Sequence, residues 1–193
     1  MEDLKLHRIS ADYLQDKQAD SLPPLMEALD DYMAEIKEEY THMPAKLCRD
    51  ILLSEYNYRI RSKLKSCRSF GLTVYAGDIC YIDFGRAYVT EAGYQHFGLV
   101  ITVSSGKALV VPMTSNPVNY SMAYDPDDNP NGLRHLMRLG RVEGMYKYSV
   151  LFLNDAKFIN TARIIDMKSW LDPESEKFRQ IVRRLFECMS MPL

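Results

Sequence analysis

The sequence has no large excess of charge of either sign. Its 24 Lys and Arg residues are nearly balanced by 26 Asp and Glu residues, which leaves a formal net charge of −2. This balance excludes a protein that binds nucleic acid through a strongly basic surface, although it is compatible with a local basic patch. A disordered chain is also excluded, because a hydrophobic fraction of 47% supplies enough apolar surface for a folded core.

Long hydrophobic runs are missing as well. The longest stretch without a formal charge, residues 108–124, contains two prolines and two asparagines, which bilayer hydrocarbon rejects. We therefore expect no transmembrane span and no membrane partner. Residues 1–6 mix charged and apolar side chains instead of forming a signal sequence, so we expect a cytoplasmic location.

Cysteine is scarce and not arranged for metal binding. The four cysteines form no C-x-x-C pair and have no histidine cluster to complete a zinc site. They are predicted to be reduced thiols, buried as small apolar side chains. The acidic stretch 125–132 does not fit a calcium loop, because Pro130 and Leu136 replace the glycine and glutamate that an EF-hand needs. We expect no metal and no cofactor.

The chain changes character near residue 68. Helical periodicity predicts one helix from Pro23 through Glu39, with Ser21 as its cap, and a second helix from Ala45 to Lys65. We therefore assign residues 1–68 to an N-terminal helical hairpin. Residues 69–193 form a second domain.

The two predicted helices carry opposite charge. Residues 11–40 contain nine acidic side chains and two lysines, whereas the second helix and its end are mainly basic. One interpretation is a pair of helices with complementary, solvated faces. The other is an acidic segment that mimics nucleic acid and covers a basic groove of the second domain, which would make the hairpin autoinhibitory.

From residue 74 the periodicity becomes that of β-strands. We expect a strand over residues 77–84, a polar loop over 85–94, and a hairpin whose strands cover 97–103 and 108–114. Gly106 suits the turn of this hairpin because glycine adopts positive φ readily. Pro112 is expected to loosen the ladder of the second strand.

The rest of the domain continues as strands and ends in a helix. Further strands are predicted over residues 133–139, 149–153 and 157–164. Asp172 is predicted to cap the last helix, with Pro173 in its first turn. The expected fold class is α+β: a small antiparallel β-barrel with a C-terminal helix, preceded by the helical hairpin.

Four segments in this order resemble the PemK/MazF toxin family. They are Gly-Asp-Ile-Cys-Tyr at 77–81, Glu-Ala-Gly-Tyr-Gln-His-Phe-Gly-Leu-Val at 91–100, Val-Pro-Met-Thr-Ser at 111–115 and the strand at 149–153. The resemblance covers roughly residues 74–190. It implies an SH3-like barrel, a homodimer and a small acidic antitoxin as partner. It further implies cleavage of single-stranded RNA without metal, in which a 2′-hydroxyl attacks the adjacent phosphorus and leaves a 2′,3′-cyclic phosphate.

The resemblance also assigns two catalytic residues. Thr114 matches the family's threonine, but His96 stands where the family has an arginine. An imidazole exchanges protons near neutral pH, whereas it clamps phosphate less well than the planar guanidinium does. Two outcomes follow. Either His96 performs general acid–base catalysis while Thr114 holds the phosphate, or the barrel is a non-catalytic module that binds a protein or nucleic-acid partner, as a gyrase-inhibitor-like or degenerate toxin would.

Contacts to RNA are expected around the loop and at the strand ends. Tyrosines there offer platforms on which unpaired bases stack. The residues proposed for RNA binding are Arg86, Tyr88, Glu91, Tyr94, Gln95, Ser115, Asn116, Asn154 and Asp155. Asn154 and Asp155 take the positions of a Glu-Gln pair that touches bases in the family, so the base preference is expected to differ.

Overall fold

The computed structural model describes residues 14–190. The chain divides into two units, Met1–Cys48 and Arg49–Leu193, and each is described by itself. Residues 49–68, which the sequence assigned to the N-terminal extension, belong to the same unit as the strands. The boundary expected near residue 68 stays a prediction.

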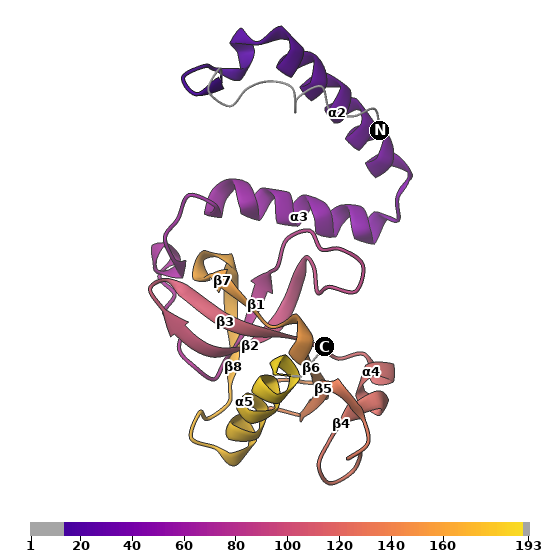
Figure 1. Cartoon of the computed structure of the whole chain (residues 1–193), viewed down its shortest axis with the longest axis vertical. Coiled ribbons are helices and arrows are strands. Elements are labelled where there is room, and N and C mark those ends of the chain that lie inside the picture. Colours follow the sequence, from indigo (N-terminus) through magenta and orange to yellow (C-terminus); the bar gives the residue numbers. More distant parts are fainter. Residues whose placement is uncertain (1–13, 191–193) are drawn as a thin grey trace. The chain divides into compact units, whose positions relative to one another are not determined.

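The first unit contains the 3-10 turn η2 (Ala19–Ser21) and the helix α2 (Pro23–His42) (Figure 1). The expected helix is confirmed, with a proline in its first turn. Ser21 is not its cap, because the Ser21 hydroxyl donates to the Gln18 carbonyl at 2.7 Å within η2, and Leu22 occupies the N-cap. α2 ends at His42, two residues before Pro44. This end is expected because a proline disfavours helical backbone in the residue before it, here Met43.

The helix α3 (Ala45–Arg61) is shorter than predicted. The sequence placed its end at Lys65, but the chain after Arg61 is held by other bonds. Leu64 accepts a hydrogen bond from Asn160 Nδ2 at 2.9 Å, and the Cys67 amide in η3 (Cys67–Phe70) donates to Thr161 Oγ1 at 3.2 Å. These long-range bonds replace the helical ones.

The second unit is built on one sheet with the order β4-β5-β6-β3-β2-β1-β8, in which β7 also pairs with β3. All pairs are antiparallel except β4 with β5. The strands are β1 (Asp78–Asp83), β2 (Gln95–Ser104), β3 (Lys107–Thr114), β4 (Ala123–Tyr124), β5 (Leu133–Gly140), β6 (Ser149–Phe152), β7 (Lys157–Asn160) and β8 (Ile164–Trp170). With α5 (Glu176–Met189) near the C-terminus, the expected α+β class is confirmed (Figure 1).

The β2–β3 hairpin follows the sequence prediction closely. Ser105 and Gly106 form a two-residue turn with φ values of 50° and 78°, as a type I′ turn requires. On the side away from β2, β3 pairs with β7 as far as Val110 and with β6 from Met113 onward. Pro112 falls in the gap between the two partners, so its missing N–H leaves no ladder bond unmade.

Further local predictions near the C-terminus are wrong. The strand expected over 157–164 is broken by η5 (Thr161–Arg163), because the Asn160 side chain accepts from the Ala162 amide at 2.8 Å. The chain then continues as β8, which pairs with β1. α5 begins at Glu176 and is capped by Ser175, so Asp172 is not its cap and Pro173 precedes its first turn. The short helix α4 (Pro117–Met122) was not predicted.

Two apolar clusters make up most of the core. The first joins the sheet to α5 and contains the buried side chains of Phe178, Ile181 and Leu185. The second includes Cys67 and Cys80, which are free and buried as expected, whereas Cys48 and Cys188 are free and only half-buried. Within residues 14–190, no helix has both the length and the apolar character needed to cross a membrane.

Candidate active site

The hairpin β2–β3 brings the two predicted catalytic residues to one end of the sheet. The last pair of the β2–β3 ladder at this end is Phe97 with Met113, and His96 and Thr114 are the next residues of the two strands. Opposite residues of antiparallel strands lie on the same face, with Cβ atoms about 4.5–5.5 Å apart. Continued by one residue, this register would set His96 opposite Thr114 at the same end of the hairpin.

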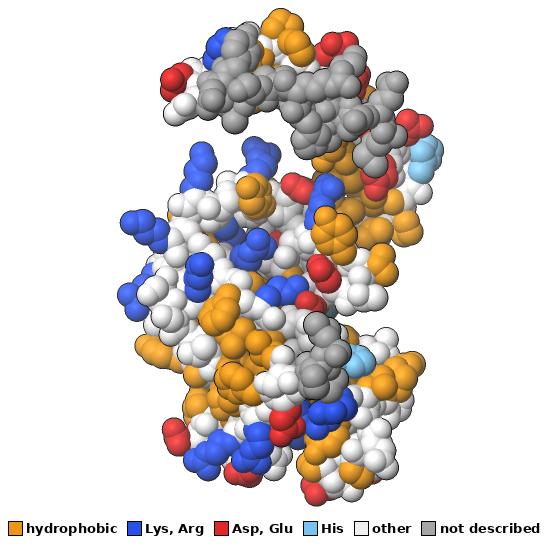
Figure 2. Space-filling view, viewed as in Figure 1, with side chains coloured by type: hydrophobic (Ala, Val, Ile, Leu, Met, Phe, Trp, Pro, Cys, Tyr) orange, Lys and Arg blue, Asp and Glu red, His pale blue; other side chains and the backbone are white. Residues whose placement is uncertain are grey.

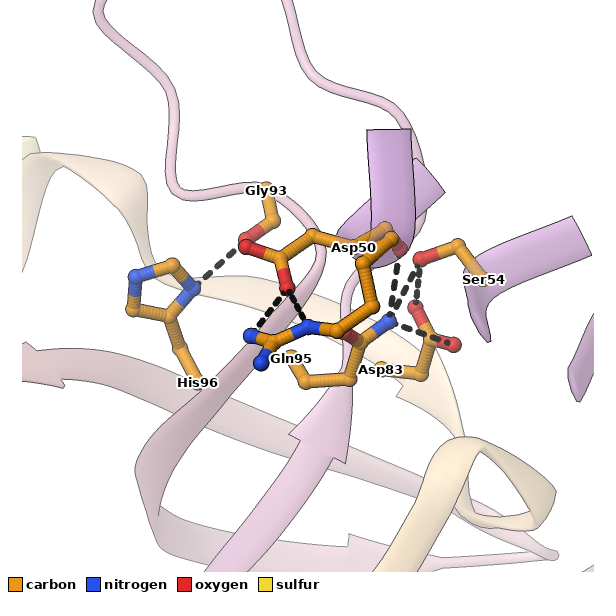
Figure 3. Close-up of polar contacts among 7 residues, drawn as sticks. Asp50, Ser54, Asp83, Gly93, Gln95 and His96 are labelled. Carbon is orange, nitrogen blue, oxygen red and sulfur yellow. Dashed lines mark hydrogen bonds and ion pairs between the residues drawn. The ribbon is translucent and has the colours of Figure 1, made fainter. Parts of the chain in front are cut away.

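The imidazole of His96 is oriented by the loop that precedes β2. Its Nδ1 lies 2.5 Å from the carbonyl oxygen of Gly93 (Figure 3). Because a carbonyl oxygen can only accept, Nδ1 carries the proton, and Nε2 of the neutral ring is an acceptor. Within the described part of the chain His96 makes no second hydrogen bond, so Nε2 can take a proton from a substrate hydroxyl.

Close packing within the loop holds the Gly93 carbonyl in place. Gly93 is buried, and a Cβ added to it would lie 2.6 Å from the Cβ of Ala87. The base of the loop is closed by two backbone bonds, Phe84 N–H to Tyr94 at 2.7 Å and Tyr94 N–H to Gly85 at 2.6 Å. The orientation of His96 thus depends on the fold of residues 85–94.

The hydroxyl of Thr114 is half-buried at the end of β3. Its Oγ1 accepts a hydrogen bond from the Asn116 amide at 3.2 Å. Among residues 14–190 no acceptor takes the hydroxyl hydrogen, so it can be donated to a ligand. The Asn116 side chain, expected to contact RNA, instead caps α4 by accepting from the Val118 amide at 2.8 Å.

A buried carboxylate lies beside this site and was missed from the sequence. Asp83 is only 3% exposed and accepts hydrogen bonds from Ser54 Oγ and Asn57 Nδ2 of α3, both at 2.7 Å, and from the Gly85 amide at 2.9 Å (Figure 3 shows the first). Asp83 lies within the strand that the sequence predicted over residues 77–84. Its partners lie 26 and 29 residues earlier, which periodicity does not reveal.

Gln95, predicted to contact RNA, is turned toward α3 instead. Its Nε2 donates to Ser54 Oγ at 2.8 Å, and more weakly to Asp83 and to the Asp50 carbonyl, both at 3.3 Å (Figure 3). Because Gln95 immediately precedes His96, this network fixes the start of β2.

Asp155 is likewise occupied by the protein rather than presented to solvent. Its Oδ2 accepts from the Ala92 amide at 2.5 Å, and its Oδ1 pairs with Lys157 Nζ at 2.7 Å. Asp155 therefore ties the loop to the segment after β6. Its neighbour Asn154 is exposed, as is Ser115 at the end of β3.

The remaining loop residues differ in how far they are engaged. Arg86 Nε donates to Glu55 of α3 at 2.9 Å, and the Glu91 carboxylate accepts from the Tyr88 amide at 3.3 Å. The Tyr88 side chain is 86% exposed, which leaves its ring open to a base. Tyr94 is half-buried and adopts a positive φ of 56°.

Two shifted groups border this region. Burial lowers the pKa of the Arg61 guanidinium, with the charge of Asp83 opposing it. Burial also raises the pKa of the Cys80 thiol to about 12. In residues 14–190, no three His, Cys, Asp or Glu side chains are grouped to hold a metal ion.

Comparison with known proteins found neither a matching family model nor a matching curated protein. Among solved structures the chain is similar to MazF from Deinococcus radiodurans, with 13% identity, 62% of this chain and 99% of that chain covered, and a TM-score of 0.47. It is also similar to the Mycobacterium tuberculosis toxin MazF-mt6, with 12% identity, coverage of 60% and 99%, and a TM-score of 0.41. A mycobacterial endoribonuclease solved with its cognate antitoxin gives 10% identity, coverage of 63% and 99%, and a TM-score of 0.42. At such low scores the similarity carries no argument about the site.

Proposed function

We propose that the chain is a toxin-like endoribonuclease that cleaves single-stranded RNA without a metal ion, with His96 and Thr114 as its catalytic residues. The observation that carries the proposal is their position at the same end of the β2–β3 hairpin, each one residue beyond its last pair, with His96 Nε2 as an acceptor and a Thr114 hydroxyl hydrogen to donate. Both side chains belong to segments that resemble the PemK/MazF family.

The two groups fit the chemistry of transesterification. His96 Nε2 takes the proton of a ribose 2′-hydroxyl as the O2′–P bond forms. The Thr114 hydroxyl donates to a phosphoryl oxygen on which charge develops. The P–O5′ bond breaks, and the leaving 5′ oxygen takes a proton from solvent. The products are a 2′,3′-cyclic phosphate and a 5′-hydroxyl.

Exposed groups around the site support binding of unpaired RNA. Tyr88 offers a stacking surface, and Ser115 and Asn154 are exposed at the ends of the neighbouring strands. Three of the predicted RNA contacts have side chains that form hydrogen bonds within the protein instead: Gln95, Asn116 and Asp155. We assign these three a role in holding the site in place. Arg86, Glu91 and Tyr94 remain proposed RNA contacts.

The proposal extends to partners and location. We propose a cytoplasmic homodimer restrained either by a small acidic antitoxin or by its own residues 1–68. The acidic character of residues 11–40 supports the second form of restraint. Removal of residues 1–48, the first unit, would then raise the rate of RNA cleavage.

Incubation with a mixed pool of unstructured RNA in the presence of EDTA tests the function. Wild type should cut the pool, and His96→Gln should cut it at least about a hundredfold more slowly, the usual effect of removing a general base. His42→Gln, at an exposed histidine, is the matched control and should retain activity. If wild type binds RNA or a protein but cuts nothing, the chain is the non-catalytic module instead.

A further inference from the structure

A cavity lies beside the Asp83 carboxylate, and neither His96 nor Gln95 is among its lining residues. Its volume is about 350 Å³, within the range of small-molecule sites. It lies between the C-terminal half of α3, the end of β1 and η5, all within the second unit. Its lining includes Tyr58, Arg61, Arg86 and Arg163.

Three arginines and two acids line this cavity, so the charged side chains of the lining sum to +1. The Asp83 carboxylate accepts bonds from Ser54, Asn57 and Gly85, and the Glu55 carboxylate accepts from Arg86. The lining therefore favours an anion. Figure 2 shows Lys and Arg side chains gathered over the C-terminal end of α3 and the segment after it, which would attract the same ligand.

Arg61 is held rigidly in the wall. Its Nη1 donates to the carbonyls of Ala162 and Ile164 at 3.1 and 3.0 Å, and its guanidinium lies 4.0 Å from the centre of the Phe70 ring. Its Nε is buried, yet has no hydrogen-bond acceptor among the described residues. Because Nε has no accessible surface, a ligand in the cavity would meet the guanidinium at Nη2, which donates to none of the described residues.

The other cavity residues fit a ligand that has both a phosphate and a flat ring. Arg163 is exposed, and within residues 14–190 its guanidinium makes one hydrogen bond, a long one of 3.3 Å from Nη1 to the Asp83 carbonyl. Guanidinium groups bind phosphate oxygens through paired N–H donors. Tyr58 is 65% exposed at the edge of the cavity and can stack on a base.

We propose that this cavity binds a nucleotide, with Arg61 and Arg163 on its phosphate and Tyr58 against its base. The nucleotide is either free or one residue of an RNA strand, because both present the same chemistry. Binding here does not depend on cleavage at His96. The shared Asp83 wall would nevertheless couple an occupied cavity to Gln95 and the start of β2.

Calorimetric titration of the full chain with adenosine 5′-monophosphate, inorganic phosphate and a short 2′-O-methyl RNA tests the proposal. The modified RNA has no 2′-hydroxyl to react, so its binding is read independently of cleavage. Arg163→Gln should weaken the monophosphate about tenfold or more, the effect of losing a charge-assisted hydrogen bond. Arg59→Gln, an exposed arginine of the same helix outside the cavity, is the matched control and should bind as wild type does.

Tyr58→Ala should weaken the monophosphate but leave inorganic phosphate unchanged. Competition between the monophosphate and the modified RNA would assign the cavity to an RNA strand, whereas independent binding would assign it to a free nucleotide. Absence of monophosphate and RNA binding overturns the proposal. Equal losses in Arg163→Gln and Arg59→Gln overturn it as well. Loss of monophosphate binding alone leaves cleavage at His96 unaffected, whereas absence of all RNA binding would also contradict the proposed function.

Discussion

The Ser54 hydroxyl donates a 2.7 Å hydrogen bond to Oδ1 of Asp83, which fastens α3 to the end of β1. The same hydroxyl accepts from Gln95 at 2.8 Å, so one buried serine links the helix to two strands. Because Gln95 adjoins His96 and Gly85 begins the loop that orients its ring, α3 supports the proposed His96 site through these bonds.

Ser54→Ala should lower the free energy of unfolding by about 1–3 kcal/mol, because it leaves a buried carboxylate short of one donor. Ser62→Ala, an exposed serine just after the same helix, should change it by less than about 0.5 kcal/mol. Urea unfolding of both variants measures the difference. Equal effects of the two substitutions would mean that the Ser54–Asp83 hydrogen bond does not stabilise the folded protein.

Asp78→Asn should alter how stability depends on pH. Asp78 is 6% exposed, and burial raises its pKa above 3.8, against a hydrogen bond from the Tyr75 amide. The folded state therefore binds the Asp78 proton more tightly than the unfolded state does. The contribution of this group to stability is fully present below pH 3.8 and is lost as the pH rises through the raised pKa of the folded state. The asparagine keeps the acceptor without the charge.

Unfolding in urea across this pH range should show the loss in wild type and in the control Asp127→Asn, but not in Asp78→Asn. Asp127 is exposed and in a loop, so its replacement leaves the buried group unchanged. An identical pH dependence in all three proteins would contradict the assignment to Asp78.

The Cys80 thiol should resist alkylation in the folded protein. Burial raises its pKa to about 12, so almost no thiolate forms at mildly alkaline pH. Because the unfolded thiol titrates near 9.0, stability is also expected to fall as pH rises above that value. Peptide mass spectrometry after brief iodoacetamide treatment should find Cys188 labelled well before Cys80. Labelling of both at one rate would show that Cys80 is accessible.

Gly93→Ala should slow RNA cleavage by about tenfold or more, because a displaced carbonyl no longer orients the His96 ring. The added Cβ would lie 2.6 Å from the Ala87 Cβ, and the double variant with Ala87→Gly removes that clash. Partial recovery of kcat in the double variant is expected. If Gly93→Ala is fully active, the loop does not position His96.

Thr114→Ala should reduce kcat by about a hundredfold or more, as expected for the loss of a donor to a developing oxyanion. Thr114→Ser retains the hydroxyl and should recover most of the activity. Single-turnover cleavage of one RNA by the two variants measures both effects. Equal losses would assign Thr114 a packing role instead of a donor role.

The features that the sequence predicted correctly are those set by residues adjacent in the chain. The turn at Ser105 and Gly106 and the interrupted ladder at Pro112 follow from local backbone preferences, and both are confirmed. The early end of α3 and the Ser54–Asp83 bond depend on partners far along the chain, which periodicity does not encode. For the same reason Gln95 and Asp155 were predicted to contact RNA, although their side chains bind the protein.

The most direct test is mass spectrometry of fragment ends from an RNA that wild type cuts, compared with the same RNA carrying a single 2′-deoxy nucleotide immediately 5′ of the cut phosphate. We predict fragments that end in a 2′,3′-cyclic phosphate and begin with a 5′-hydroxyl, and no cut at the deoxy position. Cleavage at that position, or fragments that begin with a 5′-phosphate, would contradict attack by the 2′-hydroxyl at His96 and Thr114.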